Sequence, residues 1–417
     1  MNLNVLSNDT KIDCIAKSLE KFTVLKIGHV HIKDSLQFLN TGLDTLVCNL
    51  KKYGQSRNES LSKTFKYTHE YFKETWPHLN EDVFEMFTRK GVYPYEYIDS
   101  LSILDEDELP AKEKFNSELT RSGISDPDYE FVKEMWDKLG MTTLRDLHDV
   151  YMAIDVCLLA DVFETFRSNI LEKYKLDPAH FMTAPGLTWT AGLKVTKVEL
   201  ELLTDPDMSM FIDRALIGGV SMVAHPQAHA KDGFVFYCDA NNLYGWSMMQ
   251  YLPTGGFQWI DPALENDWGS KICSLEDEGG IGYFLEVDLD YPEHLHDSHN
   301  NYPCAPEKIK VDIEDLSPHQ KELREQIQAG HSAEKLVLTL KNKKNYILHY
   351  RNLKQYLELG LELKKVHRVL QFNQSPWLKK YIDMNTQFRQ EANNKFEVNL
   401  YKLMNNFLKT IYFKHWA

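Results

Sequence analysis

The sequence predicts a mixed α+β fold of two or three domains, on three observations. The chain has 417 residues, enough to bury more than one hydrophobic core. Apolar, β-branched and aromatic runs at residues 234–238 and 282–289 are typical of buried strands. Residues 144–167 instead carry apolar side chains at helical spacing, which predicts a long amphipathic helix.

Composition indicates the class of protein and its compartment. The six cysteines are scattered and form no Cys-x-x-Cys pair, which favours a reducing compartment and no structural zinc. The sequence shows neither a signal peptide nor an apolar run long enough to span a bilayer. We therefore expect an intracellular, soluble protein, and the sequence does not distinguish nucleus from cytoplasm.

The charge of the chain is unevenly distributed. The net charge is −14, yet residues 335–417 contain 16 Lys and Arg against 5 Asp and Glu, a local charge of +11. The remaining residues therefore carry −25. Such asymmetry points to a basic segment that faces phosphates, although a solvated helical face would give the same count.

The stretch from Phe234 to Pro253 combines features of a metal site. The apolar run at 234–238 predicts a buried strand that ends at Asp239, followed by a polar turn and a helix-like stretch broken by Pro253, Gly255 and Gly256. An acid at the end of a rigid strand can bind a divalent cation, and the amides of the following turn can meet a phosphate. An Asp that merely caps the next helix is the alternative, which these features alone would favour.

The string Asp-x-x-Asn-Leu-Tyr-Gly at residues 239–245 resembles the first palm motif of family B DNA polymerases. Its spelling is similar to the protein-primed branch of viruses, organelles, linear plasmids and large self-replicating transposons, although Asn242 and Gly245 replace the commoner Ser and Pro. The resemblance implies that Asp239 binds catalytic Mg²⁺ and that Asn242, Leu243 and Tyr244 contact the incoming nucleotide. Tyr244 would lie under the sugar and exclude a 2′-hydroxyl.

The resemblance also implies a reaction and its partners. Template-directed attack of a primer 3′-hydroxyl on the α-phosphate of a dNTP would use two Mg²⁺ ions. Primer-template DNA and dNTPs are the implied partners. A terminal protein primer and the oligomeric state are left open.

Three upstream motifs resemble the 3′–5′ exonuclease domain of the same branch. Asp34-Ser35-Leu36 resembles a motif that holds single-stranded primer ends, and Lys90-Gly91 a motif whose lysine faces the scissile phosphate. Tyr151 and Asp155 lie at i and i+4 and resemble the third exonuclease motif, in which the Asp binds metal and the Tyr orients water. The alternative for Ser35 and Leu36 is a helix N-cap followed by core leucines. The alternative for Lys90 is a helix end, and the alternative for Tyr151 and Asp155 is a surface hydrogen bond.

The first two exonuclease motifs, Asp-x-Glu and Asn-x-x-(Phe/Tyr)-Asp, are not found upstream of Ser35. Two-metal hydrolysis needs several carboxylates, and Asp155 alone cannot hold two cations. We therefore predict an exonuclease domain that is a remnant without activity.

Two further patterns lie around the palm. Gly218-Gly219, before an expected short apolar strand, is similar to the Tyr-x-Gly-Gly link that touches DNA, with Leu216 in place of the Tyr. Three histidines and a cysteine at residues 294–304 suggest zinc, but a solvated loop is the favoured interpretation because no second ligand pair is present.

A fingers helix is expected from about Trp377 to Asn406, with Arg389 contacting nucleotide. Lys402 to Asn406 resembles the start of the second polymerase motif, Lys-x-x-x-Asn-Ser-x-Tyr-Gly. The resemblance implies that Lys402 neutralises charge on the triphosphate and that Asn406 contacts the nucleotide. The match ends at Phe407, and the third palm motif with its second catalytic Asp has no counterpart.

The resulting expectation is a family B DNA polymerase, truncated at both ends and inactive alone. A catalytically dead nucleic-acid-binding remnant and a gene fragment without a stable fold are the alternatives. The expected parts are an RNase H-like exonuclease remnant at 1–175, a helical linker at 176–233, a palm at 234–290, an insertion at 291–375 and partial fingers at 376–417.

Overall fold

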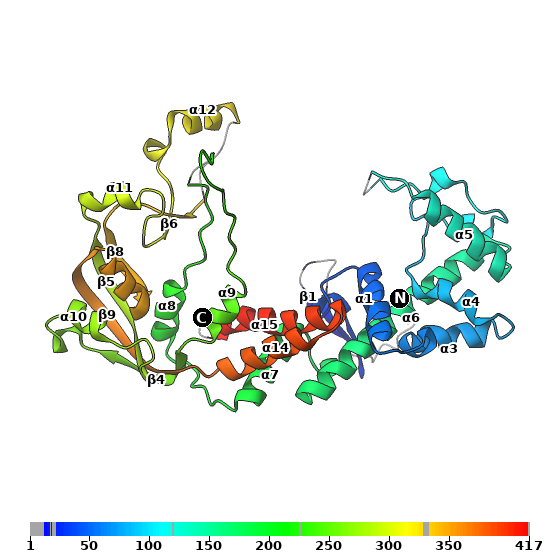
Figure 1. Cartoon of the computed structure of the whole chain (residues 1–417), viewed down its shortest axis with the longest axis horizontal. Helices are drawn as coiled ribbons and strands as arrows, with labels where there is room; N and C mark the ends of the chain where they lie inside the picture. The colour runs from blue at the N-terminus through cyan, green and yellow to red at the C-terminus, as the bar shows by residue number, and fades with distance from the viewer. Residues whose placement is uncertain are drawn as a thin grey trace. The chain divides into compact units, whose positions relative to one another are not determined.

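The computed structural model describes residues 12–16, 18, 22–118, 121–224, 227–327 and 333–415, with side chains through residue 408. The chain divides into two compact units (Figure 1). Unit 1 comprises Met1–Ala191 and Asp383–Phe407, and unit 2 comprises Gly192–Ile382 and Leu408–Ala417. Both contain helices and antiparallel sheet in the described residues, which confirms the predicted mixed α+β class.

The described part of unit 1 contains a small antiparallel sheet, several helices and a largely irregular stretch before α5. Its strands pair in the order β1-β2-β3, which are Ile12–Ala16, Phe22–Ile27 and Val30–Lys33. The helices that lie wholly in unit 1 are α1 (Leu43–Ser56), α2 (Leu61–Thr64), α3 (Lys66–Thr75), α4 (Glu81–Phe84), α5 (Asp126–Leu139) and α6 (Leu144–Tyr174). The larger parts of α7 (Ala184–Thr196), α14 (Lys379–Glu391) and α15 (Lys395–His415) also belong to it.

Helix α6 is the central element of unit 1, and it confirms the helix predicted at 144–167. Its start is fixed by Asp146, whose carboxylate accepts hydrogen bonds from the amides of Thr142 and Thr143 at 2.8 and 2.9 Å. Apolar residues at helical spacing, including Leu147, Ile154 and Leu158, are buried along it. They pack against α1 and α3, so the periodic face becomes the core of the unit.

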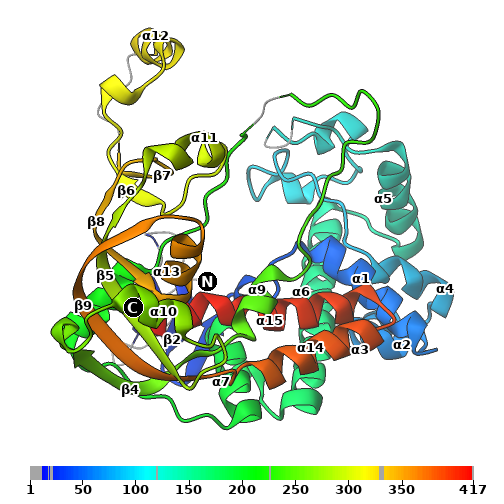
Figure 2. The same cartoon turned by 60° about the vertical axis from the view of Figure 1, so that its left-hand side comes forward.

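The single fingers helix predicted from 377 to 406 is wrong, because the segment forms two helices, α14 and α15. Asn394 ends the connection between them: its side chain accepts a hydrogen bond from Glu397 N at 3.0 Å and donates one to the Glu397 carboxylate at 2.9 Å. The two helices lie side by side (Figure 2), joined by a buried bond from Asn385 to Asn405 at 2.7 Å. Local capping therefore overrides an otherwise continuous helical pattern.

Unit 2 is organised around a four-stranded antiparallel sheet of order β4-β9-β5-β8. The strands are β4 (Leu252–Ile260), β5 (Ile281–Asp290), β8 (Lys343–His349) and β9 (Glu362–Ser375), and β5 confirms the strand predicted at 282–289. A separate pair is formed by β6 (Glu307–Ile309) and β7 (Lys335–Val337). The helices are α8 (Pro206–Ala215), α9 (Leu243–Met248), α10 (Trp268–Ser274), α11 (His296–His299), α12 (Pro318–Gln326) and α13 (Tyr350–Glu358).

The core of unit 2 lies between the sheet and the helices α10 and α13. Alternate residues of β5, including Leu285 and Val287, are fully buried there against Ile272 of α10 and Leu353 of α13. Alternation along β5 directs Glu286 to the opposite face, where Arg214 of α8 lies 3.9 Å from its carboxylate. Most residues of β5 are therefore buried on both faces of the sheet.

Pro253, Gly255 and Gly256, expected to break a helix, lie inside strand β4 instead. The pairing of β4 with β9 shifts register around Pro253 and Gly255, because Pro cannot donate to the ladder and both glycines adopt positive φ. These residues bend a strand rather than end a helix. Within the described residues, no helix is both long and apolar enough to cross a membrane.

Candidate active site and nucleic-acid-binding residues

Tyr151 and Asp155 form the predicted pair on one face of α6. The Tyr151 hydroxyl donates to Asp155 Oδ2 at 2.9 Å, and the Tyr151 side chain is buried. Burial raises the pKa of Tyr151, and hydrogen bonds with Tyr95 and Asp155 raise it further. The phenol therefore stays protonated at neutral pH and remains a hydrogen-bond donor to the carboxylate.

The segment that follows Lys90 packs directly on Tyr151, so two of the predicted exonuclease motifs lie together in unit 1. Tyr93 stacks on the Tyr151 ring with 4.7 Å between centroids, and the Tyr95 hydroxyl is hydrogen-bonded to the Tyr151 hydroxyl. A Cβ on Gly91 would lie 2.9 Å from the Tyr151 ring, so glycine is needed for this approach. Lys90 itself is partly exposed at the edge of the cluster.

Asp155 could act as a cation ligand, but the described residues do not place enough other ligands beside it. Its Oδ1 atom is buried and accepts no hydrogen bond, which leaves one carboxylate oxygen available. Among the described residues, however, no group of three or more His, Cys, Asp and Glu side chains could hold a metal ion. The residues around Asp155 therefore do not complete a two-metal site.

The buried strand predicted at 234–238 is wrong. In the structure this segment forms neither strand nor helix, and Phe234 and Tyr237 are 87% and 95% exposed. It belongs to a long irregular connection between α8 and α9 in unit 2 (Figure 1). A strand is buried only where another strand and a covering layer meet it, and no described strand pairs with this segment. Asp239 is accordingly exposed on an irregular stretch rather than held at a strand end.

The residues after Asp239 form a tight turn into α9. Asn242 adopts the left-handed conformation with φ of 53°, which asparagine tolerates better than most residues, and it precedes the first helical residue, Leu243. The Asn242 side chain lies against Gly245, where an added Cβ would come within 2.3 Å of its amide. A larger residue at position 245 would therefore require the Asn242 side chain to move. Tyr244 is 57% exposed, so its ring can meet a ligand.

Ser35 and Leu36 lie in a 3₁₀ turn, Ser35–Gln37, capped by Asp34, whose carboxylate accepts from Leu36 N at 3.0 Å. The helix N-cap that was the alternative interpretation of this motif is therefore present. Leu36 is 55% exposed, however, so it is not the core leucine that this alternative supposed. Core packing therefore does not explain Leu36, and its predicted contact with DNA stays a prediction.

Gly218 and Gly219 lie in the connection that follows α8 and are exposed. The short apolar strand expected after them is wrong, because residues 220–223 form no strand. Both glycines belong to the same irregular connection as Asp239 in unit 2.

The zinc hypothesis for residues 294–304 is not supported by the described residues, which hold no metal-binding group there. His299 and His296 instead surround Tyr291, with His299 Nδ1 2.8 Å from its hydroxyl and His296 Nε2 3.2 Å from its carbonyl. The Cys304 amide donates to the same hydroxyl at 3.1 Å. All six cysteines lie in the described residues and are free.

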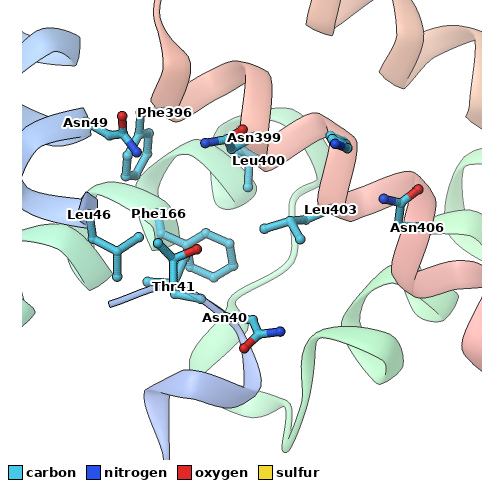
Figure 3. A pocket seen from close by; sticks show the side chains of 12 residues that line it. Asn40, Thr41, Leu46, Asn49, Phe166, Phe396, Asn399, Leu400, Leu403 and Asn406 are labelled. Atoms are coloured by element: carbon cyan, nitrogen blue, oxygen red, sulfur yellow. The ribbon is translucent and has the colours of Figure 1, made fainter. Parts of the chain in front are cut away.

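Lys402 and Asn406 are brought together on one face of α15, where both line a pocket in unit 1 (Figure 3). The pocket has a volume of about 220 Å³ and is closed on its other side by residues 39–49 and by Phe166 of α6. Arg389 is exposed on α14 and does not line it.

Sequence reasoning missed several residues beside these sites. The contact of Tyr95 with Tyr151 was not predicted, although Tyr95 lies five residues after Lys90. Asn40, Thr41 and Asn399, also not predicted, line the pocket beside Lys402. Asn399 and Asn406 lie two helical turns apart, on one face of the expected helix, and were a usable signal. No sequence signal pointed to Asn40 and Thr41, because only folding places them opposite α15.

Among solved structures, the chain is similar to phi29 DNA polymerase. The orthorhombic crystal form matches at 12% identity with a TM-score of 0.44, covering 97% of this chain and 54% of that one. The ternary complex with primer-template DNA and incoming nucleotide substrates matches at 13% identity and a TM-score of 0.46, covering 96% and 53%. The chain thus spans about half the length of these proteins.

The search of curated proteins found no match. The family described as DNA polymerase type B, organellar and viral, has a model that matches residues 3–408, nearly the whole chain. This match confirms the family that the motif at 239–245 predicted, and the chain therefore belongs to the organellar and viral type B DNA polymerases.

Proposed function

We propose that this chain carries part of a DNA-directed DNA polymerase, whose reaction joins a dNTP to the 3′-hydroxyl of a primer on a DNA template. The family match over residues 3–408 carries the proposal. The Asp239–Gly245 string supports it, because it resembles the first palm motif of family B DNA polymerases, which implies contacts with the incoming nucleotide. Primer-template DNA and dNTPs are the proposed ligands, and a terminal protein is a proposed primer.

The turn at Asn242 is proposed to position the nucleotide contacts. Its left-handed backbone directs the chain into α9, so that Leu243 and Tyr244 in the first turn of the helix follow shortly after Asp239. The half-exposed Tyr244 ring would lie against the sugar, where a 2′-hydroxyl would collide with it. Lys402, exposed on α15, would neutralise phosphate charge, and Arg389 and Asn406 would add contacts.

The proposed cofactor is Mg²⁺, which when bound would stabilise charge on the attacking and leaving oxygens. Asp239 and Asp155 would each offer one carboxylate to a separate site. The described residues form no cluster of three acidic, histidine or cysteine ligands around either of them. We propose for this reason that the chain alone neither extends a primer nor removes its 3′ end.

A primer-extension assay with labelled primer-template, all four dNTPs and Mg²⁺ or Mn²⁺ tests this proposal. The parent chain should retain affinity for primer-template and give no extension, and labelled single strands should not be shortened. Robust extension that Asp239→Asn abolishes would disprove inactivity and strengthen the polymerase assignment. Extension unaffected by Asp239→Asn would contradict the role given to Asp239.

The absence of a metal cluster in the described residues also favours a second candidate, a nucleic-acid-binding protein without catalysis. Its basic residues 335–417 would bind phosphates. DNA affinity that falls steeply with salt, with no turnover under any metal condition, would favour this second candidate. Restored extension after addition of the remaining polymerase segments in trans would exclude it.

A further inference from the structure

Three buried polar side chains join three helices of unit 1. The hydroxyl of Tyr174, the last residue of α6, donates to Asn385 Oδ1 of α14 at 2.7 Å, and Asn385 Nδ2 donates to Asn405 Oδ1 of α15 at 2.7 Å. These side chains are 3%, 0% and 6% exposed. None of them contributes to the buried polar atoms of the described residues that lack a partner. We call these three residues the buried network.

The apolar contacts between α14 and α15 would tolerate more than one alignment of the two helices. The ring of Phe388 on α14 packs on Tyr401 of α15 with 5.2 Å between centroids, and Leu400 and Met404 are buried on α15. Burial of apolar surface has no preferred direction, so a displaced helix could still be buried. A hydrogen bond between two amides instead requires a narrow range of distance and angle. The buried network is therefore the contact that distinguishes one alignment from another.

A displaced α15 would leave buried amides without partners. A slip of one residue moves a helix by about 1.5 Å along its axis and rotates it by about 100°. Asn405 would then leave Asn385, and both amides would remain in a buried environment without their hydrogen bond, which is unfavourable. Buried asparagines set the register of coiled coils for the same reason.

Asn405 lies within one helical turn of the two residues of α15 to which the proposed function gives nucleotide contacts. Lys402 precedes it by three positions, and Asn406 follows it directly. Because α15 is continuous through this region, fixing Asn405 also fixes the height and rotation of both neighbours. Lys402 and Asn406 are exposed, so burial of their own side chains does not fix their positions.

We propose that the residues of the buried network, Tyr174, Asn385 and Asn405, are positioning residues that set the register of α15 and thereby hold Lys402 and Asn406 at the incoming dNTP. The inference rests on the proposed function for the identity of the ligand. The register itself depends only on the three helices. A network that merely adds stability is the alternative, and variants that remove the bonds but keep the stability separate the two.

The test variant Tyr174→Phe/Asn385→Leu/Asn405→Leu replaces the whole network by apolar side chains. Replacing every partner of a buried polar network costs little stability, so its unfolding midpoint in urea should stay close to that of the parent. Asn405→Leu alone should lower the midpoint, because the buried Asn385 amide loses its acceptor. Gln387→Leu is the matched control, since it replaces an exposed amide of α14 and should leave the midpoint unchanged.

Distances between spin labels at Met152 on α6 and Asn399 on α15, both exposed, measure the register. The parent and Gln387→Leu should each give one narrow distance distribution. The triple variant should give a broader one, or a second population displaced by up to about 5.4 Å, one helical turn. Asn405→Leu, which also lacks the bond between α14 and α15, should show the same change. Distributions as narrow as that of the parent in the folded variants would overturn the proposal.

Anisotropy of a fluorescent dNTP in the presence of Mg²⁺ tests the consequence for the nucleotide. The triple variant should bind it about tenfold more weakly than the parent, the effect of a displaced charged contact. In a chain that already carries Lys402→Gln, the same three substitutions should have a clearly smaller effect, because the network acts through that residue. Equal losses in both backgrounds would contradict the positioning role. A parent chain that holds one register and binds no dNTP would instead contradict the proposed nucleotide site, so the two failures are distinguishable.

Discussion

At the scale of single residues, two aspartates on α6 show how different environments give different roles. Asp161 is 2% exposed and accepts hydrogen bonds from the amides of Tyr67 and Thr68 at 2.8 and 3.1 Å, and from the Thr68 hydroxyl at 2.7 Å. It therefore caps α3 from 93 residues away. Asp155, one turn and a half earlier, keeps one buried oxygen without a partner. The first carboxylate is structural, and the second is available to a ligand.

Substitution of Asp161 should destabilise unit 1 in a graded way. Asp161→Ala removes every acceptor for the first amides of α3, so the free energy of unfolding should fall by about 3 kcal/mol. Asp161→Asn keeps one acceptor oxygen, so the free energy of unfolding should fall by less than in Asp161→Ala. Urea unfolding followed by circular dichroism measures both, and an equal cost for the two variants would contradict the capping role.

The pH dependence of stability has an identifiable source in Asp177. Hydrogen bonds from Arg167, at 2.8 and 2.7 Å, lower the pKa of Asp177 to about 2. Because the folded state lowers this pKa, the contribution to stability is complete above about pH 4 and is lost as the pH falls toward 2. Unfolding midpoints at pH 5, 4 and 3 should therefore fall less in Asp177→Asn than in the parent chain. Parallel pH profiles for the two chains would disprove the assignment.

At the scale of elements, short polar signals decide where helices and strands change course. The tandem asparagines at 393 and 394 divide one continuous helical pattern into α14 and α15, and only Asn394 makes the capping bonds to Glu397. Gly255 and Gly256 likewise bend β4, which continues to pair with β9 on both sides of the shift in register. Each signal was visible in the sequence, and its effect depended on which neighbouring element was present.

Asn394→Ala should lower the thermal stability of α15, since loss of an N-cap costs about 1 kcal/mol. Asn393→Ala changes the same residue type one position earlier and should leave the melting temperature unchanged. Differential scanning fluorimetry of the two variants gives the comparison. Equal losses from both substitutions would show that the helix start is set by something other than the cap.

At the scale of the whole molecule, the composition of residues 234–238 and the packing of the chain predict different environments for them. Their composition is that of a core strand, but Phe234, Phe236 and Tyr237 are almost fully exposed. Burial depends on a second strand and a covering layer, which the described residues do not provide for this segment. Exposed apolar runs with high β propensity promote self-association.

Phe236→Ser tests whether residues 234–238 form an exposed segment or a packed strand. In the exposed segment the substitution should change the free energy of unfolding by less than about 0.5 kcal/mol and should reduce aggregation. In a packed strand, loss of the ring would cost about 3 to 5 kcal/mol. Denaturant unfolding and light scattering of the purified variant measure both quantities. Phe372→Ser, on the buried strand β9, is the control that should show the large loss.

The sequence by itself determined the family, the mixed α+β class, the α6 helix and the β5 strand. These follow from local information: a short motif spelled in order, or an apolar period that repeats over enough residues to select one structure. The i, i+4 placement of Tyr151 and Asp155 belongs to the same category, because helix geometry alone joins them.

Only the tertiary structure decided which residues distant in the sequence lie in contact. It placed Tyr93 and Gly91 on Tyr151, and it set Asn40 and Asn49 opposite Lys402 across a pocket. It also left the run before Asp239 exposed, although its composition predicted burial. The physical reason is the same in each case: burial and ligand geometry depend on partners distant in the sequence, and a local pattern carries no information about whether those partners are in place.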